Sequence, residues 1–143
     1  MTESLGKYIT TISKYINYYI NKRANKLNLN IHQVHILKIL YNNEGINQEE
    51  LTDISKSDKV TISKLLDGLV KEEYVEKRKN EEDRRIKNLY VTEKGESIKK
   101  EIKNILKDTT KILSADFTEK ENVIIRKLLN RMLDNIYDEI NNK

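Results

Sequence analysis

Ammonium and hydroxyl groups alternate in one short segment of the sequence, residues 56–64. Lysine side chains contact phosphates or guanine, and hydroxyl groups reach phosphates or base edges. A valine in the same segment offers methyl groups that can meet the methyl group of thymine. We therefore predict a DNA-contacting surface made by Lys56, Ser57, Lys59, Val60, Thr61, Ser63 and Lys64. An ordinary amphipathic helix with a solvated outer face fits the same pattern equally well.

Cations flank an acidic tip in a second segment, residues 78–87. An extended loop that carries arginine can enter a minor groove, whose narrow A·T-rich form concentrates negative potential. Asp83 can hold the guanidinium of Arg85 through two parallel hydrogen bonds and so orient it toward DNA. The predicted contacts in this segment are Arg78, Asp83, Arg84, Arg85 and Lys87. A solvated turn with weak surface ion pairs is the alternative.

The sequence lacks the residue patterns of catalytic and metal sites. It contains no cysteine, which excludes thiolate ligands, cysteine nucleophiles and disulfides. His32 and His35 can share a helix face, but no third metal ligand is evident, and a place in the first turn of a helix explains His32 equally well. No nucleophile–base pattern, glycine-rich phosphate loop or H-E-x-x-H motif is present. We expect no metal site, no cofactor and no enzymatic activity.

Composition fits a helical protein of one domain. The chain has 143 residues, of which 35% are charged, with a net charge of +4 and no proline. This modest net charge does not by itself establish nucleic-acid binding. No apolar run approaches the ~18–20 residues of a membrane span, and the N-terminus does not resemble a secretion signal. We expect a cytoplasmic protein with no membrane partner.

Apolar residues at helical spacing and capping pairs define the elements that must position the two cationic segments. They predict helices over residues 5–20, 30–42, 47–54, 59–72, 92–113 and 118–140. Residues 74–79 and 86–91 are short, β-branched and separated by a polar loop, which predicts a hairpin. Two short helices, a polar turn between them and a following hairpin make a winged helix-turn-helix over residues 30–92. The predicted fold class is mainly α with a small β component.

The helices outside this winged helix-turn-helix carry apolar stripes that need a partner. Residues 1–29 and 93–143 must bury these stripes on each other or on a second subunit. A second subunit is the simpler solution. We therefore expect a single domain over residues 1–143, in which the flanking helices form a dimerisation region.

Four short motifs follow one another between residues 29 and 95. They are Leu29-Asn30-Ile31-His32-Gln33, the stretch from Leu51 through Lys64, Asp83-Arg84-Arg85, and Val91-Thr92-Glu93-Lys94-Gly95. In this order and spacing they resemble the MarR family of winged-helix transcriptional regulators, in which the positions of Lys59, Thr61, Ser63 and Lys64 contact DNA. The resemblance implies a homodimer that binds a pseudo-palindromic operator. It also implies a recognition helix in the major groove, a wing in the minor groove, and repression of transcription.

The resemblance implies, in addition, a crevice between the dimer region and the DNA-binding lobe, where small aromatic or phenolic anions act as effectors. Tyr15, Tyr18, Tyr19 and His35 are candidates to line it. Tyrosines also commonly fill cores and subunit interfaces, which is the alternative for these residues. A winged helix can instead serve as a protein–protein interaction module, which would show no salt-dependent binding to duplex DNA.

The chain departs from the family pattern at three positions. Val91 replaces the usual leucine, and the wing lacks the proline that often precedes its acidic pair, which predicts a more mobile tip. Glu73 stands where the family prefers glycine after the recognition helix. If φ is positive there, glutamate costs about 1 kcal/mol or more.

Overall fold

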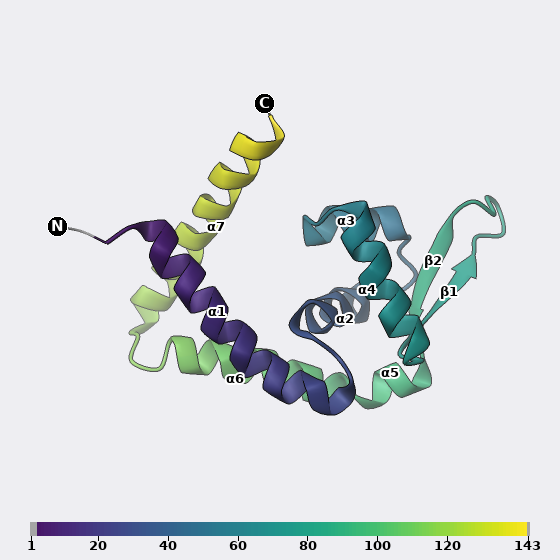
Figure 1. Cartoon of the computed structure of the whole chain (residues 1–143), viewed down its shortest axis with the longest axis horizontal. Coiled ribbons are helices and arrows are strands. Elements are labelled where there is room, and N and C mark those ends of the chain that lie inside the picture. The colour runs from purple at the N-terminus through teal and green to yellow at the C-terminus, as the bar shows by residue number, and fades with distance from the viewer. Residues whose placement is uncertain (1–2, 143) are drawn as a thin grey trace. The chain divides into compact units, whose positions relative to one another are not determined.

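The computed structural model describes residues 3–142, and the fold in this range is mainly helical with one two-stranded sheet (Figure 1). The chain divides into two compact units, one ending at Thr109 and the other beginning at Thr110. The elements are α1 (Leu5–Ala24), the short 3₁₀ helix η1 (Asn25–Leu27), α2 (Ile31–Asn42), α3 (Gln48–Ser55), α4 (Lys59–Lys71), β1 (Val75–Lys79), β2 (Lys87–Val91), α5 (Glu93–Ser97), α6 (Lys99–Leu113) and α7 (Glu119–Asn141). The predicted fold class is confirmed.

The helices begin where the capping pairs in the sequence predict. The side chains of Asn30 and Asn47 accept hydrogen bonds from the backbone N–H three residues on, and those residues, Gln33 and Glu50, bond back to the capping N–H. Thr118 and Glu121 do the same at the start of α7. Each pair satisfies two amide groups that the first turn of a helix leaves without a partner.

The first unit has one continuous hydrophobic core, to which the helices before and after the winged helix-turn-helix also contribute. Ile20 and Ala24 of α1, together with Ile102 and Ile105 of α6, are buried with residues of α2, α3, α4 and the sheet. The buried side chains at the centre are Val34, Leu37, Leu40, Leu51, Ile62, Leu66, Leu69, Val75 and Leu89. Helix α4, which is the recognition helix expected from the resemblance, is therefore held by a core that also fixes the end of α1 and the first part of α6.

The hairpin has the predicted position, and its register pairs Val75 with Val91 and Lys79 with Lys87. A third segment that the sequence did not reveal runs along β2. Gly45 donates its N–H to the Leu89 carbonyl, and Leu89 donates to the Ile46 carbonyl, at 3.0 and 2.8 Å. The base of the wing is thereby tied to the segment that leads into α3.

The helix expected over residues 92–113 is interrupted, which corrects that prediction. Ile98 has φ −101° and ψ 2°, so the chain leaves helical geometry between α5 and α6. Helix α5 packs closely against the ends of the two strands at Gly95. A Cβ there would overlap the Tyr74 carbonyl oxygen and a Val91 methyl group, and the Gly95 carbonyl accepts a hydrogen bond from the Tyr41 hydroxyl at 2.6 Å.

The second unit contains α7, whose apolar side chains are exposed. None of the described α7 residues is buried. Its exposed large apolar side chains are Val123, Ile124, Leu128, Leu129, Leu133, Ile136, Tyr137 and Ile140, of which the six from Leu128 onward form one stripe. In residues 3–142, no helix has the length and apolar character required to cross a membrane.

Candidate nucleic-acid interface

The first turn of α4 is fixed by local hydrogen bonds. Asp58 caps the helix, and its carboxylate accepts from the Thr61 N–H at 2.8 Å and from the Thr61 hydroxyl at 2.7 Å. These two bonds lower the pKa of Asp58 below its usual value. Lys56 ends α3 with φ 54°, in the left-handed region, and so turns the chain toward α4.

Gln33 attaches the recognition helix to α2. Its side-chain oxygen caps α2, and its Nε2 donates to the Leu65 carbonyl in the middle of α4 at 3.3 Å. Gly68 leaves the room for this side chain, because a Cβ at Gly68 would overlap the Gln33 Nε2 atom. The glutamine of the first sequence motif therefore sets the position of α4 as well as the start of α2.

The burial pattern of α4 gives it one outward face. Ile62, Leu66 and Leu69 are buried, and at 100° per residue the direction opposite to them passes between Val60 and Lys64. Lys59, Val60 and Lys64 are exposed, while Ser63 is half-buried. Further along the helix, the Asp67 carboxylate pairs with Lys77 of β1 at 3.5 Å. Lys77 thus partly neutralises the negative charge of Asp67, which lies toward the C-terminal end of this outward face.

The wing tip is ordered by side-chain bonds rather than by a proline. The Asn80 side-chain oxygen accepts from the Glu82 and Asp83 N–H groups at 2.8 and 3.1 Å, and its Nδ2 donates to the Asn88 side-chain oxygen at 3.1 Å. The Ile86 N–H closes the loop on the Asp83 carbonyl. Asparagine commonly builds such turns, because its short side chain bonds backbone groups two or three residues on.

Asp83 and Arg85 form the two-pronged pair that their spacing suggests. The Nε and Nη2 atoms of Arg85 donate to the two carboxylate oxygens of Asp83, each at 3.1 Å, and the Arg85 N–H also donates to Asp83. These bonds lower the pKa of Asp83 and raise that of Arg85. The Arg85 side chain is nonetheless 91% exposed, so it is oriented and accessible at the same time.

A hollow of about 550 Å³ brings part of the recognition helix and part of the wing together. It is lined by Gln48, Glu49, Thr52, Lys59, Arg85 and Lys87. The three cations were predicted from the sequence. The three α3 residues were not, although Thr52 follows Glu49 and Gln48 by three and four positions, which makes it a neighbour of both on the helix surface.

The remaining predicted contacts differ in how available they are. Arg78 is bonded to Glu76 on the same strand, and its guanidinium lies 4.1 Å from the centre of the Tyr90 ring. Lys56, Ser57 and Arg84 are exposed. Arg78, like Arg85, is therefore paired with a carboxylate, and the place of Glu76 two residues away on the same strand, and so on the same face, indicates this.

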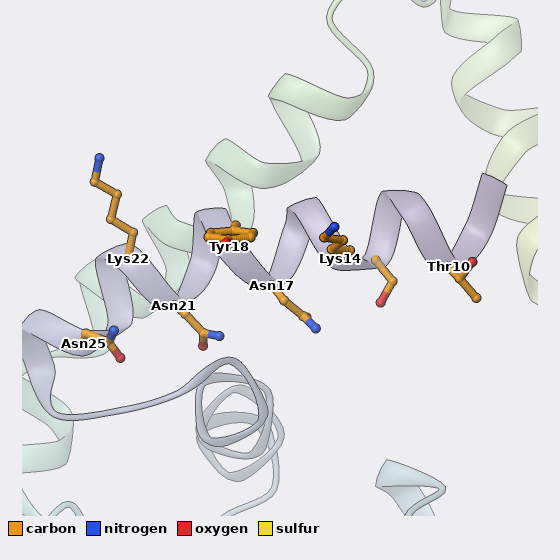
Figure 2. A pocket seen from close by; sticks show the side chains of 8 residues that line it. Thr10, Lys14, Asn17, Tyr18, Asn21, Lys22 and Asn25 are labelled. Carbon is orange, nitrogen blue, oxygen red and sulfur yellow. The ribbon is translucent and has the colours of Figure 1, made fainter. Parts of the chain in front are cut away.

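A second hollow, of about 830 Å³, runs along α1, as Figure 2 shows in close view. It is lined by Thr10, Ser13, Lys14, Asn17, Tyr18, Asn21, Lys22 and Asn25, which follow one another along the helix. Sequence reasoning named only Tyr18 of these residues. The polar side chains recur every three or four positions, which is the signal for this face.

The other predicted effector residues lie elsewhere. Tyr19 packs against the core, and its hydroxyl accepts a hydrogen bond from Arg23 at 3.1 Å. Tyr15 is exposed, with the Lys14 ammonium 5.8 Å from its ring centre. Desolvation, followed by repulsion from His32 and Lys38, lowers the pKa of His35 on α2. Within residues 3–142, no three histidine, aspartate or glutamate side chains are grouped to hold a metal ion.

Known proteins share both this sequence pattern and this fold. The MarR family model matches residues 29–87. The HTH-type transcriptional regulator MgrA of Staphylococcus aureus is 30% identical over 129 residues, which cover 88% of this chain and 84% of MgrA. A MarR transcriptional regulator from Methanosarcina mazei Go1 has 34% identity and a TM-score of 0.83, with 92% of this chain and 94% of that chain covered.

A more distant structure shows the same fold. S. aureus MepR, crystallised as a complex with DNA, has a TM-score of 0.87 at 20% identity, with 94% of this chain and 99% of that chain covered. The motifs, the winged helix-turn-helix and these likenesses agree. The chain therefore belongs to the MarR family of transcriptional regulators.

Proposed function

We propose that this regulator is a repressor that binds a pseudo-palindromic duplex operator as a homodimer. In the proposed complex, α4 occupies the major groove, and the β1–β2 wing reaches the adjacent minor groove. The observation that carries the proposal is the hollow of about 550 Å³, in which Lys59 at the start of α4 meets Arg85 and Lys87 of the wing. The phosphate backbone runs between the two grooves, so cations that α4 and the wing place in one hollow can contact it together.

The geometry of the wing supports the minor-groove part of this proposal. A narrow minor groove attracts arginine, and the entropic cost of inserting a side chain falls when that side chain is already oriented. Asp83 holds the Arg85 guanidinium without covering it. The fold relative MepR, which was crystallised with DNA, supports the use of this fold on duplex DNA.

The homodimer proposal rests on exposed apolar faces. The α7 stripe is entirely unburied, and Leu5, Tyr8, Ile9 and Ile12 are exposed on the first half of α1. Contiguous apolar surface of this kind marks an interaction site in a folded protein. Two-fold symmetry of the protein would call for a matching pseudo-palindrome in the operator. Repression is proposed from the family resemblance.

The effector proposal is centred on the α1 hollow. Lys14 and Lys22 offer positive charge there, and the exposed ring of Tyr18 offers a stacking surface, as Figure 2 shows. This combination suits a small aromatic anion. Tyr15 lies on the same helix, next to Lys14, and can extend the site, whereas Tyr19 and His35 do not line the hollow.

Fluorescence anisotropy with short duplexes over a salt series tests the DNA-binding proposal. We expect tight binding to selected sequences, with log Kd rising steeply with log salt. Lys59→Ala should lower this slope by about one per chain. Lys103→Ala is the matched control, because Lys103 is an exposed lysine of α6 that does not line the hollow. Weak binding with no salt dependence would contradict the proposal and favour a protein–protein interaction module.

A further inference from the structure

One exposed apolar side chain lies on the outward face of the first turn of the recognition helix, α4. Val60 is 64% exposed and points away from the buried Ile62, Leu66 and Leu69. Val70 is the other exposed large apolar residue of α4, but it lies in the last turn of the helix and is only 37% exposed. In the first turn, the outermost group is therefore a pair of methyl groups rather than a hydrogen-bonding group.

The neighbouring hydroxyl group does not replace this missing hydrogen bond. Thr61 already donates its hydroxyl to the Asp58 carboxylate at 2.7 Å, and its N–H bonds to the same carboxylate at 2.8 Å. A Thr61 hydroxyl that donated to a base would have to give up its bond to the Asp58 carboxylate, although the N–H bond of the cap would remain. Lys59 is engaged differently, because it lines the hollow shared with the wing, where phosphate contacts are expected.

Only one base presents an apolar group in the major groove. Guanine, adenine and cytosine show hydrogen-bond donors and acceptors there, whereas thymine adds the C5 methyl group. A valine in contact with the polar edge of one of these bases would remove water from donors and acceptors to which it cannot hydrogen-bond, and this is unfavourable. Against thymine, the methyl groups of the valine and the C5 methyl group of the base remove each other's apolar surface from water, which is favourable.

We propose that Val60 reads the C5 methyl group of one thymine in each half-site and so fixes the base at that position of the operator. The proposal rests on the proposed DNA-binding function, and it adds the chemical group that is recognised. Thr61 then serves to hold the first turn of α4 in place and makes no base contact through its hydroxyl. The prediction is thus specific to a methyl group, and it can be tested by removing that group alone.

The test begins by selecting bound sequences from random duplexes with the full-length protein. Each thymine of the selected site is then replaced by deoxyuridine, which lacks only the C5 methyl group. For wild type, we expect replacement at one position per half-site to weaken binding about fourfold, the effect of one buried methyl group. For Val60→Ser, the same replacement should have no effect, because the apolar partner is gone.

Val70→Ser is the matched control and should keep the full effect of deoxyuridine. Circular dichroism should show unchanged helicity for both variants. If no thymine shows a methyl effect that disappears in Val60→Ser, or if the selected sites contain no thymine, the inference fails while the DNA-binding proposal stands. If no duplex sequence is selected at all, the DNA-binding proposal fails and this inference fails with it.

Discussion

Arg85 and Asp83 show how a single pair can combine charge with direction. The carboxylate bonds two of the three guanidinium nitrogens of an arginine that is otherwise surrounded by solvent. Exposed ion pairs contribute little to stability, so this pair is better explained by the orientation that it gives to Arg85. Because the pKa of Asp83 is lowered, the pair remains charged at neutral and mildly acidic pH.

The separate roles of the two residues can be measured. Arg85→Ala should weaken operator binding and lower the salt slope by about one per chain, because a phosphate-facing charge is lost. Asp83→Ala should weaken binding about two- to tenfold, the cost of ordering a free side chain, and leave the slope unchanged. Salt-series anisotropy distinguishes the two results. Glu82→Ala, at the same tip, should cause no loss; a loss equal to that of Asp83→Ala would contradict the orienting role.

Glu73 is a second residue whose effect follows from its backbone. Its φ is 64°, its N–H bonds the Val70 carbonyl, and the Tyr74 N–H bonds the Leu69 carbonyl, which is the glycine-favouring end of a helix. Residue 73 therefore has the positive φ at which glutamate is expected to be less stable than glycine. We expect Glu73→Gly to raise the free energy of unfolding in urea by about 1 kcal/mol.

The neighbouring glutamate provides the control for this prediction. Glu72 has φ −79°, so Glu72→Gly should destabilise the protein, since glycine gains nothing from that conformation and loses more chain entropy. Equal effects of the two substitutions would show that the backbone conformation of residue 73 is not the cause. At this scale the sequence predicted the Asp83–Arg85 pair, but it did not predict that Glu76 and Tyr90 engage Arg78.

At the scale of elements, a few close approaches fix how the wing joins the helices. The Thr92 hydroxyl donates to the Glu73 carbonyl, and the Lys94 ammonium donates to the Glu72 carbonyl at 2.7 Å. Gly95 lies directly against the Tyr74 backbone. The motif that opens α5 therefore fastens the end of α4 to the end of β2.

Gly95→Ala should disrupt this junction. The added Cβ has no room against backbone atoms, and overpacking of this kind costs about 1–3 kcal/mol in the free energy of unfolding. Gly6→Ala is the matched control, because the nearest atom to its added Cβ is the Ser4 Oγ at 3.5 Å in an exposed helix. Urea denaturation measures both. A Gly95→Ala protein as stable as wild type would contradict the tight junction.

The cap of α4 predicts a pH dependence. The folded-state pKa of Asp58 is lowered by its bonds to Thr61, so its contribution is present above the ordinary aspartate pKa of about 4 and is lost as pH falls through the lowered folded value. Asp58→Asn keeps a capping oxygen but cannot titrate.

We therefore expect Asp58→Asn to lose less stability than wild type between pH 6 and pH 2, as measured by urea unfolding across this range. Asp58→Ala should be destabilised at every pH, because it has no capping group. An acid-induced loss in Asp58→Asn equal to that of wild type would show that the Asp58 charge is not responsible.

The helices and strands were more predictable from the sequence than the contacts and breaks that join them. Capping pairs and apolar spacing located the helices and the hairpin, because those signals act within a few residues. The bonds of Gly45 and Ile46 to β2 and the interruption at Ile98 depend on chain segments far apart in sequence or on local backbone angles. Periodicity carries no information on these features.

At the scale of the whole molecule, the exposed stripe of α7 calls for a partner. We expect Leu133→Glu to raise the dissociation constant of the proposed dimer about tenfold or more, since burying a leucine contributes about 1.5–3 kcal/mol and a buried glutamate charge opposes association. Sedimentation velocity at several concentrations measures this effect. Lys127→Glu alters the charge on the polar side of the same helix and should leave the dimer intact; equal dissociation would contradict an interface formed by the stripe.

The exposed apolar face of α7 also bears on how the amount of active regulator depends on the concentration of the chain. If two chains must meet before a paired site can be occupied, the amount of active dimer rises with the square of the chain concentration, as long as monomers predominate. Halving expression would then reduce the active form fourfold. A promoter under such control would respond sharply to small changes in synthesis or degradation of the regulator, even with no effector present.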